Sequence, residues 1–198
     1  MGVSARWEEL ARETLSDDWA LVTKSRLRFT FADGTSAEQV RQVYDRGDGA
    51  VILPYDPARG MVLLGRQFRW PAAYRGDAEP FLIEAAAGLL DDAAPEARIR
   101  AEAEEELGLR LEAATFRFSA YSSPGSVSEV LHYFTAPYDA TAKRAKFGGL
   151  REEGEEIEAI ELALAKALKM IDEGRIRDAK TIILLQYAAL NLIPEAAR

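Results

Sequence analysis

The stretch AAGLLDDAAPEARIRAEAEEELGLRL, residues 86–111, contains the clearest local signals in the chain. Proline suits the first position of a helix, because the N–H that it lacks would have no partner there. From Ala97 to Leu107 every residue is a good or fair helix former, and Gly108 follows where a left-handed residue commonly ends a helix. The stretch therefore predicts a helix that begins at Pro95 and ends before Gly108.

Three glutamates of this helix share one face. Glu102, Glu105 and Glu106 are three and four residues apart, a spacing that brings helical side chains together. Like charges at that spacing repel, and Mg²⁺, which takes hard oxygen ligands, would remove the repulsion. The opposite face is apolar enough to pack on a sheet, with Ile99, Ala103 and Leu107. A solvated acidic helix is the alternative interpretation of such a run, and the flanking glycines and the rest of the chain argue against it.

The segment resembles the Nudix box, whose pattern is G-x5-E-x7-R-E-U-x-E-E-x-G-U with U an aliphatic residue. The matching positions are Gly88, Glu102, Ala103, Glu105, Glu106, Gly108 and Leu109. The interval from Gly88 to the E-x-x-E-E core is one residue shorter than the pattern. Ala94 occupies the early glutamate position, with Glu96 two residues later. Ala101 occupies the position of the arginine that orients the glutamates, and we expect the neighbouring Arg100 to reach round in its place.

Composition predicts one globular domain, or one domain with a sizeable appendage. The chain has 198 residues, of which 48% are hydrophobic and 29% charged, so it can bury a full core. The absence of cysteine excludes disulfides and thiolate metal sites, and a single histidine excludes an all-imidazole zinc site within one chain. His132 lies inside an apolar strand pattern, which favours a structural role over a contact with substrate.

Charge and hydropathy restrict the partners and the location. A net charge of −8 argues against binding to long nucleic acids, but metal-binding carboxylates can still bind a small phosphorylated substrate through the metal. No run of about 18 apolar residues is present, so no membrane span is expected. The N-terminus, with Glu8, Glu9 and Glu13, is unlike a signal peptide, and we expect a cytoplasmic protein.

Strand patterns dominate the chain before the helix. Residues 21–31 and 36–44 flank Asp33-Gly34, a strong hairpin signal, whereas residues 1–20 fit either a short helix or an irregular edge strand. The other expected strands are residues 50–53, 61–68, 80–87, 115–121, 130–136 and 157–162. The other expected helices are residues 163–171 and 179–193, and residues 143–156 are expected to form a mobile loop. This order predicts an α+β or α/β fold with a mixed sheet.

Beyond the box, most of the chain resembles one Nudix branch, the GDP-mannose pyrophosphatases, which are related to the ADP-ribose pyrophosphatases. The matching segments are VYDRGDGAVIL (43–53), RQFR (66–69), IEAAAGLLDD (83–92), YSSPGSVSEVLHYF (121–134), EEGEEIEAIEL (152–162) and IRDAKTIILL (176–185). The shortened box and its Pro95-Glu96 pair also occur in this branch. The resemblance implies an α+β fold, an αβα sandwich with a mixed β-sheet, over residues 47–198. It also implies an N-terminal β-rich extension, residues 1–46, whose strands cross to the partner in a homodimer.

The resemblance further implies the site residues. Metal ligands for Mg²⁺, with Mn²⁺ as a substitute, would be the Ala87 carbonyl, Glu102, Glu106 and Glu155. Substrate contacts would be Trp19, Arg41, Gln42, Arg69, Ala87, Gly88, Leu89, Glu129 and Lys180. Three positions depart from the branch: Ser126 replaces a glycine, Gly154 an acidic residue and Trp19 a tyrosine.

Hydrolysis of a diphosphate needs an activated water and neutralised phosphate oxygens. Arg69 and Lys180 could neutralise charge, with arginine the better fork for phosphate. Glu155, on the expected loop, is one candidate general base, and Glu105 and Glu129 are its rivals. The sequence does not choose among the three.

Four functions follow from these residues. The leading one is Mg²⁺-dependent hydrolysis of a nucleoside diphosphate sugar to a nucleoside monophosphate and a sugar phosphate, and ADP-ribose is the second substrate. A non-catalytic sensor of such ligands is favoured by the loss of arginine at Ala101 and opposed by the retained glutamates. The fourth is an interaction module that docks through its acidic helix without magnesium.

Overall fold

The computed structural model describes residues 6–141 and 146–194 of the chain, and it divides into two compact units. The first unit contains residues 1–48 together with the segment 121–130. The second unit contains residues 49–120 and 131–198. None of the helices in the described ranges is long and apolar enough to cross a membrane.

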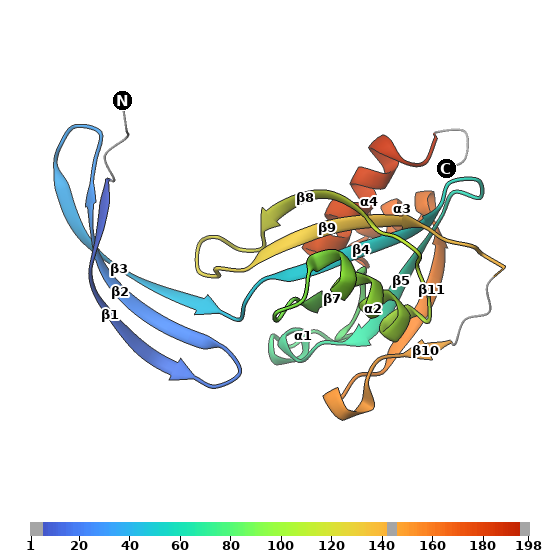
Figure 1. Ribbon diagram of the computed structural model, residues 1–198, viewed down its shortest axis with the longest axis horizontal. Coiled ribbons are helices and arrows are strands. Elements are labelled where there is room, and N and C mark those ends of the chain that lie inside the picture. The colour runs from blue at the N-terminus through green and yellow to red at the C-terminus, as the bar shows by residue number, and fades with distance from the viewer. Residues whose placement is uncertain (1–5, 142–145, 195–198) are drawn as a thin grey trace. The chain divides into compact units, whose positions relative to one another are not determined.

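The first unit is built on a three-stranded antiparallel sheet in the order β1-β2-β3 (Figure 1). Its strands are β1 (Trp7–Asp17), β2 (Leu21–Thr30) and β3 (Ser36–Asp45). The predicted hairpin is confirmed: Gly34 has a φ of +85°, and Asp33 accepts a hydrogen bond from the Thr35 N–H at 2.9 Å. Of the two alternatives for residues 1–20, the described part is a strand. Register shifts near Leu10 and Leu15 interrupt its alternation, so the sequence pattern alone did not decide between the two alternatives.

The second unit contains a mixed eight-stranded sheet. The main order is β10-β11-β5-β4-β9-β8, with β6 beside β5 and β7 beside β4. The strands are β4 (Gly49–Asp56), β5 (Met61–Phe68), β6 (Phe81–Glu84), β7 (Ala86–Leu89), β8 (Thr115–Tyr121), β9 (Val130–Pro137), β10 (Phe147–Gly148) and β11 (Ile157–Ala163). The β4–β9 pair is parallel, whereas β4–β7, β5–β6 and β5–β11 are antiparallel. The predicted mixed sheet is confirmed.

Helices cover both faces of this sheet, as Figure 1 shows. The helix α2 (Pro95–Leu107) packs Ile99 and Leu107 against Ile52 on one face. The helices α3 (Leu164–Asp172) and α4 (Ala179–Asn191) pack on the other face, in the core that holds Val51. Successive residues of β4 therefore enter opposite cores, as the period of a strand requires. The result is an αβα sandwich.

Three details differ from the expectations. A short helix, α1 (Trp70–Tyr74), was not predicted. The single strand expected over residues 80–87 is divided at Ala85 into β6 and β7, because the two pieces pair with different neighbours, β5 and β4. The loop expected over residues 143–156 contains β10 and the 3₁₀ helix η1 (Arg151–Glu153). Its first three residues lie outside the described part of the chain, and its mobility stays a prediction.

Candidate active site

The two glutamates expected to bind metal face β7 from α2. The helix begins at Pro95 and ends at Gly108, whose φ is 62°, as the sequence predicted. Glu102 and Glu106, one turn apart, are only 6% and 3% exposed. A Cβ atom at Gly88 of β7 would lie 1.8 Å from Oε1 of Glu102, so only glycine allows this carboxylate to approach the strand so closely.

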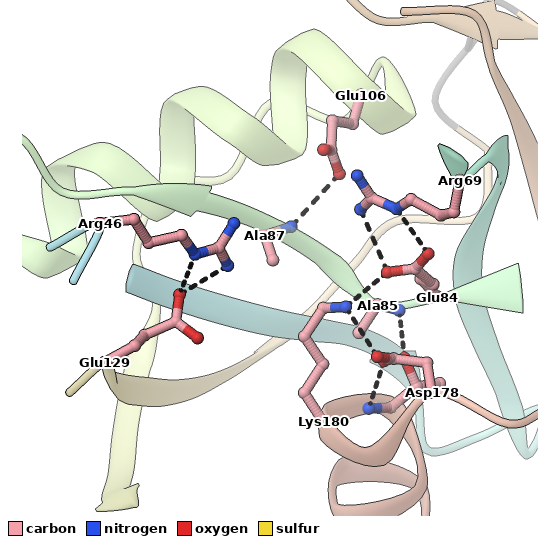
Figure 2. Close-up of polar contacts among 10 residues, drawn as sticks. Arg46, Arg69, Glu84, Ala85, Ala87, Glu106, Glu129, Asp178 and Lys180 are labelled. Carbon is pink, nitrogen blue, oxygen red and sulfur yellow. Dashed lines mark hydrogen bonds and ion pairs between the residues drawn. The ribbon is translucent and has the colours of Figure 1, made fainter. Parts of the chain in front are cut away.

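Glu106 is connected to β7 and is crowded by negative charge. Its Oε2 accepts a hydrogen bond from the Ala87 N–H at 3.3 Å (Figure 2). Burial raises the pKa of Glu106 well above its ordinary value, and the charges of Glu102 and Glu155 raise it further. In the described ranges, no three Asp, Glu, His or Cys side chains form a group that could hold a metal ion. The predicted ligand set therefore depends on the Ala87 carbonyl as well as on carboxylates.

Two glycines bring the segment that carries Glu155 against the end of α2. A Cβ atom at Gly148 would lie 2.5 Å or less from the carbonyl oxygens of Glu105 and Glu106, so this approach requires glycine. The Gly149 N–H donates to the Glu105 carbonyl at 2.8 Å. The Glu155 carboxylate accepts from the Leu150 N–H at 3.4 Å. The structure thus brings Glu155 within electrostatic range of Glu106.

A second group of charged side chains joins the residue after β5, the strand β6 and the start of α4 (Figure 2). Glu84 accepts from Arg69 Nε at 2.8 Å and Nη2 at 3.1 Å, and from Lys180 Nζ at 2.5 Å. Lys180 also pairs with Asp178 at 2.9 Å. The predicted phosphate ligands Arg69 and Lys180 therefore lie together, with Glu84 between them. The sequence analysis missed Glu84 and Asp178, although an acidic residue inside an apolar strand and an Asp-x-x-Thr helix start were visible signals.

The charges of this group shift the pKa of Glu84 downward. Burial alone would raise that pKa, but Lys180 and Arg69 outweigh burial and lower it to about 2. Burial opposes the charge of Lys180 too, and Glu84 with Asp178 nevertheless raises its pKa. Glu84 and Lys180 are therefore both ionised at neutral pH.

Comparisons with known proteins agree with this geometry. Residues 6–44 match the family described as the N-terminal domain of the GDP-mannose pyrophosphatase NudK. The GDP-mannose pyrophosphatase of Yersinia enterocolitica is 44% identical over 189 residues, which cover 96% of this chain and 98% of the relative. The enzyme of the same name from Pectobacterium atrosepticum is 46% identical over 180 residues, covering 91% and 92%. The chain belongs to the GDP-mannose pyrophosphatase family of Nudix hydrolases.

The box arginine of the Nudix family has a different substitute here from the expected one. The expectation for Arg100 is wrong: its Nε donates to the Leu111 carbonyl at 2.9 Å, away from the glutamates. Arg98 instead pairs with Glu102 Oε1 at 2.5 Å and donates Nε to the Leu89 carbonyl at 3.1 Å. The i to i+4 spacing of Arg98 and Glu102 was a usable sequence signal.

The remaining substrate contacts implied by the family lie in the first unit. Glu129 is 4% exposed and accepts from Arg46 Nε at 2.8 Å, and the Arg46 guanidinium lies 5.7 Å from the centre of the Trp19 ring. Arg46 therefore links two predicted contacts, and the sequence analysis missed it. Arg41 and Gln42 lie on β3 with exposed side chains, and Arg41 donates to the side chain of its neighbour Gln39.

His132 has an ordinary structural partner in the second unit. Its Nδ1 shares a hydrogen bond of 2.9 Å with the Ser119 hydroxyl.

Proposed function

We propose that this protein hydrolyses the diphosphate bond of GDP-mannose in a Mg²⁺-dependent reaction that yields GMP and mannose 1-phosphate. The observation that carries the proposal is the buried pair Glu102 and Glu106 against β7, in a chain that aligns along nearly its whole length with GDP-mannose pyrophosphatases. Carboxylates this buried repel one another unless a cation lies between them. A Mg²⁺ ion that binds together with the diphosphate substrate would supply that cation.

The chemistry of the donor set fits Mg²⁺. Glu102 and Glu106 offer hard oxygen ligands. Burial, followed by the charges of Glu102 and Glu155, raises the pKa of Glu106, so a bound cation would favour its ionised form. The Ala87 carbonyl and Glu155 would complete the set. When bound, the metal supplies Lewis-acid activation of the phosphates and lowers the pKa of a water.

The side chains of the protein would perform the remaining tasks. Arg69 would neutralise phosphate oxygens, because a guanidinium presents parallel donors. Glu155 is our choice of general base. The described residues give its carboxylate one long backbone hydrogen bond, whereas Glu129 is ion-paired with Arg46 at 2.6 Å. Replacing Glu155 with Gln should lower kcat far more than it changes KM, and an unchanged kcat would transfer the role to Glu105 or Glu129.

The direct test is phosphatase-coupled phosphate release from a panel of nucleotide sugars and ADP-ribose, with Mg²⁺ and with EDTA. We expect Mg²⁺-dependent turnover that is fastest with GDP-mannose. Turnover that is fastest with ADP-ribose would keep the chemistry and replace the substrate. Tight binding without turnover would reject the enzyme in favour of a ligand sensor. Binding that does not need Mg²⁺ would point to a docking module.

We also propose that the first unit mediates a homodimer. Large apolar side chains on its three-stranded sheet, or directly after a strand in the case of Phe31, are 41–64% exposed in the single chain: Trp7, Leu15, Phe31 and Val40. Apolar surface of this kind is favourable to bury against a second copy. Sedimentation of the full chain and of a variant lacking residues 1–42 tests the proposal, and a truncated protein that still sediments as a dimer would reject it.

A further inference from the structure

The Arg69–Glu84–Lys180–Asp178 group, here called the charge row, is more buried than a surface ion-pair network. The side chains of Glu84, Lys180 and Asp178 are 3%, 15% and 17% exposed, and that of Arg69 is 37% exposed. The four formal charges cancel. Buried ion pairs lose much of their attraction to desolvation and commonly stabilise a fold no more than apolar residues would. A contribution to the stability of the fold therefore does not by itself explain why these four charged residues are buried together.

The inner end of the charge row is fixed to α4. Asp178 is the N-cap of that helix and accepts from the Thr181 N–H at 3.0 Å and the Thr181 hydroxyl at 2.6 Å. The same hydroxyl accepts from the Ala85 N–H at 2.7 Å, next to Glu84. Lys180, held between Asp178 and Glu84, is thus placed by α4 and by the junction of β6 and β7. It has little freedom to move towards a substrate.

The outer end of the charge row presents one free edge of a guanidinium. Glu84 accepts from Nε and Nη2 of Arg69, which leaves Nη1 for another acceptor. Figure 2 shows this remaining edge directed towards Glu106, on the side of the predicted metal ligands. The backbone of Arg69 is fixed as well, since its N–H donates to the Pro80 carbonyl at 2.9 Å.

We propose that Glu84 is a positioning residue that holds Arg69 so that its free guanidinium edge meets the substrate diphosphate, and that Lys180 acts by holding Glu84 and does not contact the substrate. This inference rests on the proposed diphosphate hydrolysis. It assigns a role to Glu84 and changes the role predicted for Lys180. A guanidinium fixed before the substrate arrives loses no orientation on binding, which is how preorganised charge accelerates a reaction.

A double-mutant cycle tests whether Glu84 acts through Arg69. The cycle compares the wild type, Glu84→Gln, Arg69→Met and the double variant, all by kcat/KM for GDP-mannose at saturating Mg²⁺. We expect Glu84→Gln to cost on the order of 100-fold, as misplaced contact residues do. In the Arg69→Met background the same change should cost less than about twofold, because no guanidinium remains to be positioned. A purely structural role for Glu84 predicts that the two losses multiply, and that result would overturn the inference.

A second double-mutant cycle uses Lys180→Met in place of Glu84→Gln. It tests the inference even if the Glu84→Gln variant does not fold. The loss of kcat/KM caused by Lys180→Met should also disappear in the Arg69→Met background. A further loss in that background would show that Lys180 contacts substrate itself and would overturn its new role. Glu79→Gln is the matched control, because it breaks an exposed pair with Arg66 at 2.8 Å on the adjacent strand, and it should leave kcat/KM unchanged.

The failure of the inference and the failure of the proposed function give different results. An active wild type with multiplying losses rejects only the positioning role. A wild type that turns over no nucleotide sugar rejects the proposed function, and the positioning role is rejected with it.

Discussion

Two glutamates of the second unit have almost the same burial and opposite electrostatics. Glu84 is 2% exposed and Glu106 is 3% exposed, and burial raises the pKa of both. Glu84 nevertheless has a pKa of about 2, because Lys180 and Arg69 lie against it. Glu106 has a pKa well above the ordinary value, because burial raises it and the acids Glu102 and Glu155 raise it further, against a smaller opposing effect of Arg69.

The difference shows that neighbours, more than depth, determine what a buried carboxylate can do. The charge row balances its own charges, which suits a rigid support. The group of Glu102, Glu106 and Glu155, here called the socket, carries excess negative charge. This excess suits the binding of a cation from solution. Buried glutamates can thus serve two adjacent purposes in one protein: Glu84 holds a cationic side chain in place, and Glu106 is available to bind a cation.

The largest expected effect follows from removing the charge of the socket. Glu106→Gln keeps the size of the side chain and removes a predicted metal ligand, so kcat should fall at least about 1,000-fold, equivalent to roughly 4 kcal/mol. Steady-state kinetics with GDP-mannose over a range of Mg²⁺ concentrations measures the loss. The exposed Glu104 on the same helix supplies the control, since Glu104→Gln should retain wild-type rates. Full activity of Glu106→Gln would remove this residue from the metal site.

The same substitution in the charge row should instead affect stability. Glu84→Gln leaves Arg69 and Lys180 with an uncompensated buried charge, and the free energy of unfolding should fall by about 3 kcal/mol. Glu106→Gln in metal-free protein relieves repulsion and should unfold no more readily than the wild type. Urea unfolding in EDTA compares the two variants at pH 7. Equal losses of stability would mean that the two sites do not differ electrostatically as described.

The pH dependence of stability should differ in sign between the two sites. The folded-state pKa of Glu84 is depressed to about 2, so its stabilising contribution is complete above its ordinary pKa, near 4.5, and is lost as the pH falls towards 2. Roughly 2 kcal/mol of that contribution should disappear between pH 7 and pH 3. The folded-state pKa of Glu106 is raised, so metal-free stability should instead decrease as the pH rises above 4.5.

Metal-free unfolding of the wild type and the two Gln variants across pH 3–8 separates these terms. The stability difference between wild type and Glu84→Gln should shrink below pH 4.5. The advantage of Glu106→Gln over wild type should grow above it. Curves that stay parallel over the whole range would contradict both pKa shifts.

The sequence predicted the socket better than the charge row, because the signals for the socket are local and those for the charge row are not. Pro95, Gly108 and the spacing of Glu102 and Glu106 are local signals, and they placed the helix and its acidic face correctly. Glu84 and Lys180 are 96 residues apart, and nothing in either local pattern indicates the pairing.

Other open or wrong expectations have the same origin. For β1 the sequence left a helix and an irregular edge strand as alternatives, because bulges interrupt its alternation, and the edge strand is confirmed. The expected single strand divides into β6 and β7 because each pairs with a distant strand. Arg98 is different, because its helical spacing to Glu102 was local. Arg100 is adjacent to Ala101 in the chain, but adjacent residues of a helix point in different directions, so it does not reach the glutamates.

The smallest expected effect concerns Arg98, a compensating charge that α2 itself supplies to Glu102. Arg98 fastens Glu102 to the Leu89 carbonyl, so it should hold the carboxylate in place for a cation. Arg98→Met should weaken Mg²⁺ binding by about tenfold, measured by calorimetric titration. Arg100→Met removes an arginine that also binds a backbone carbonyl, but not a glutamate, and should leave Mg²⁺ affinity unchanged. If Arg98→Met instead tightens Mg²⁺ binding, the arginine competes with the metal for Glu102, and the socket is closed by its own ion pair until a cation displaces it.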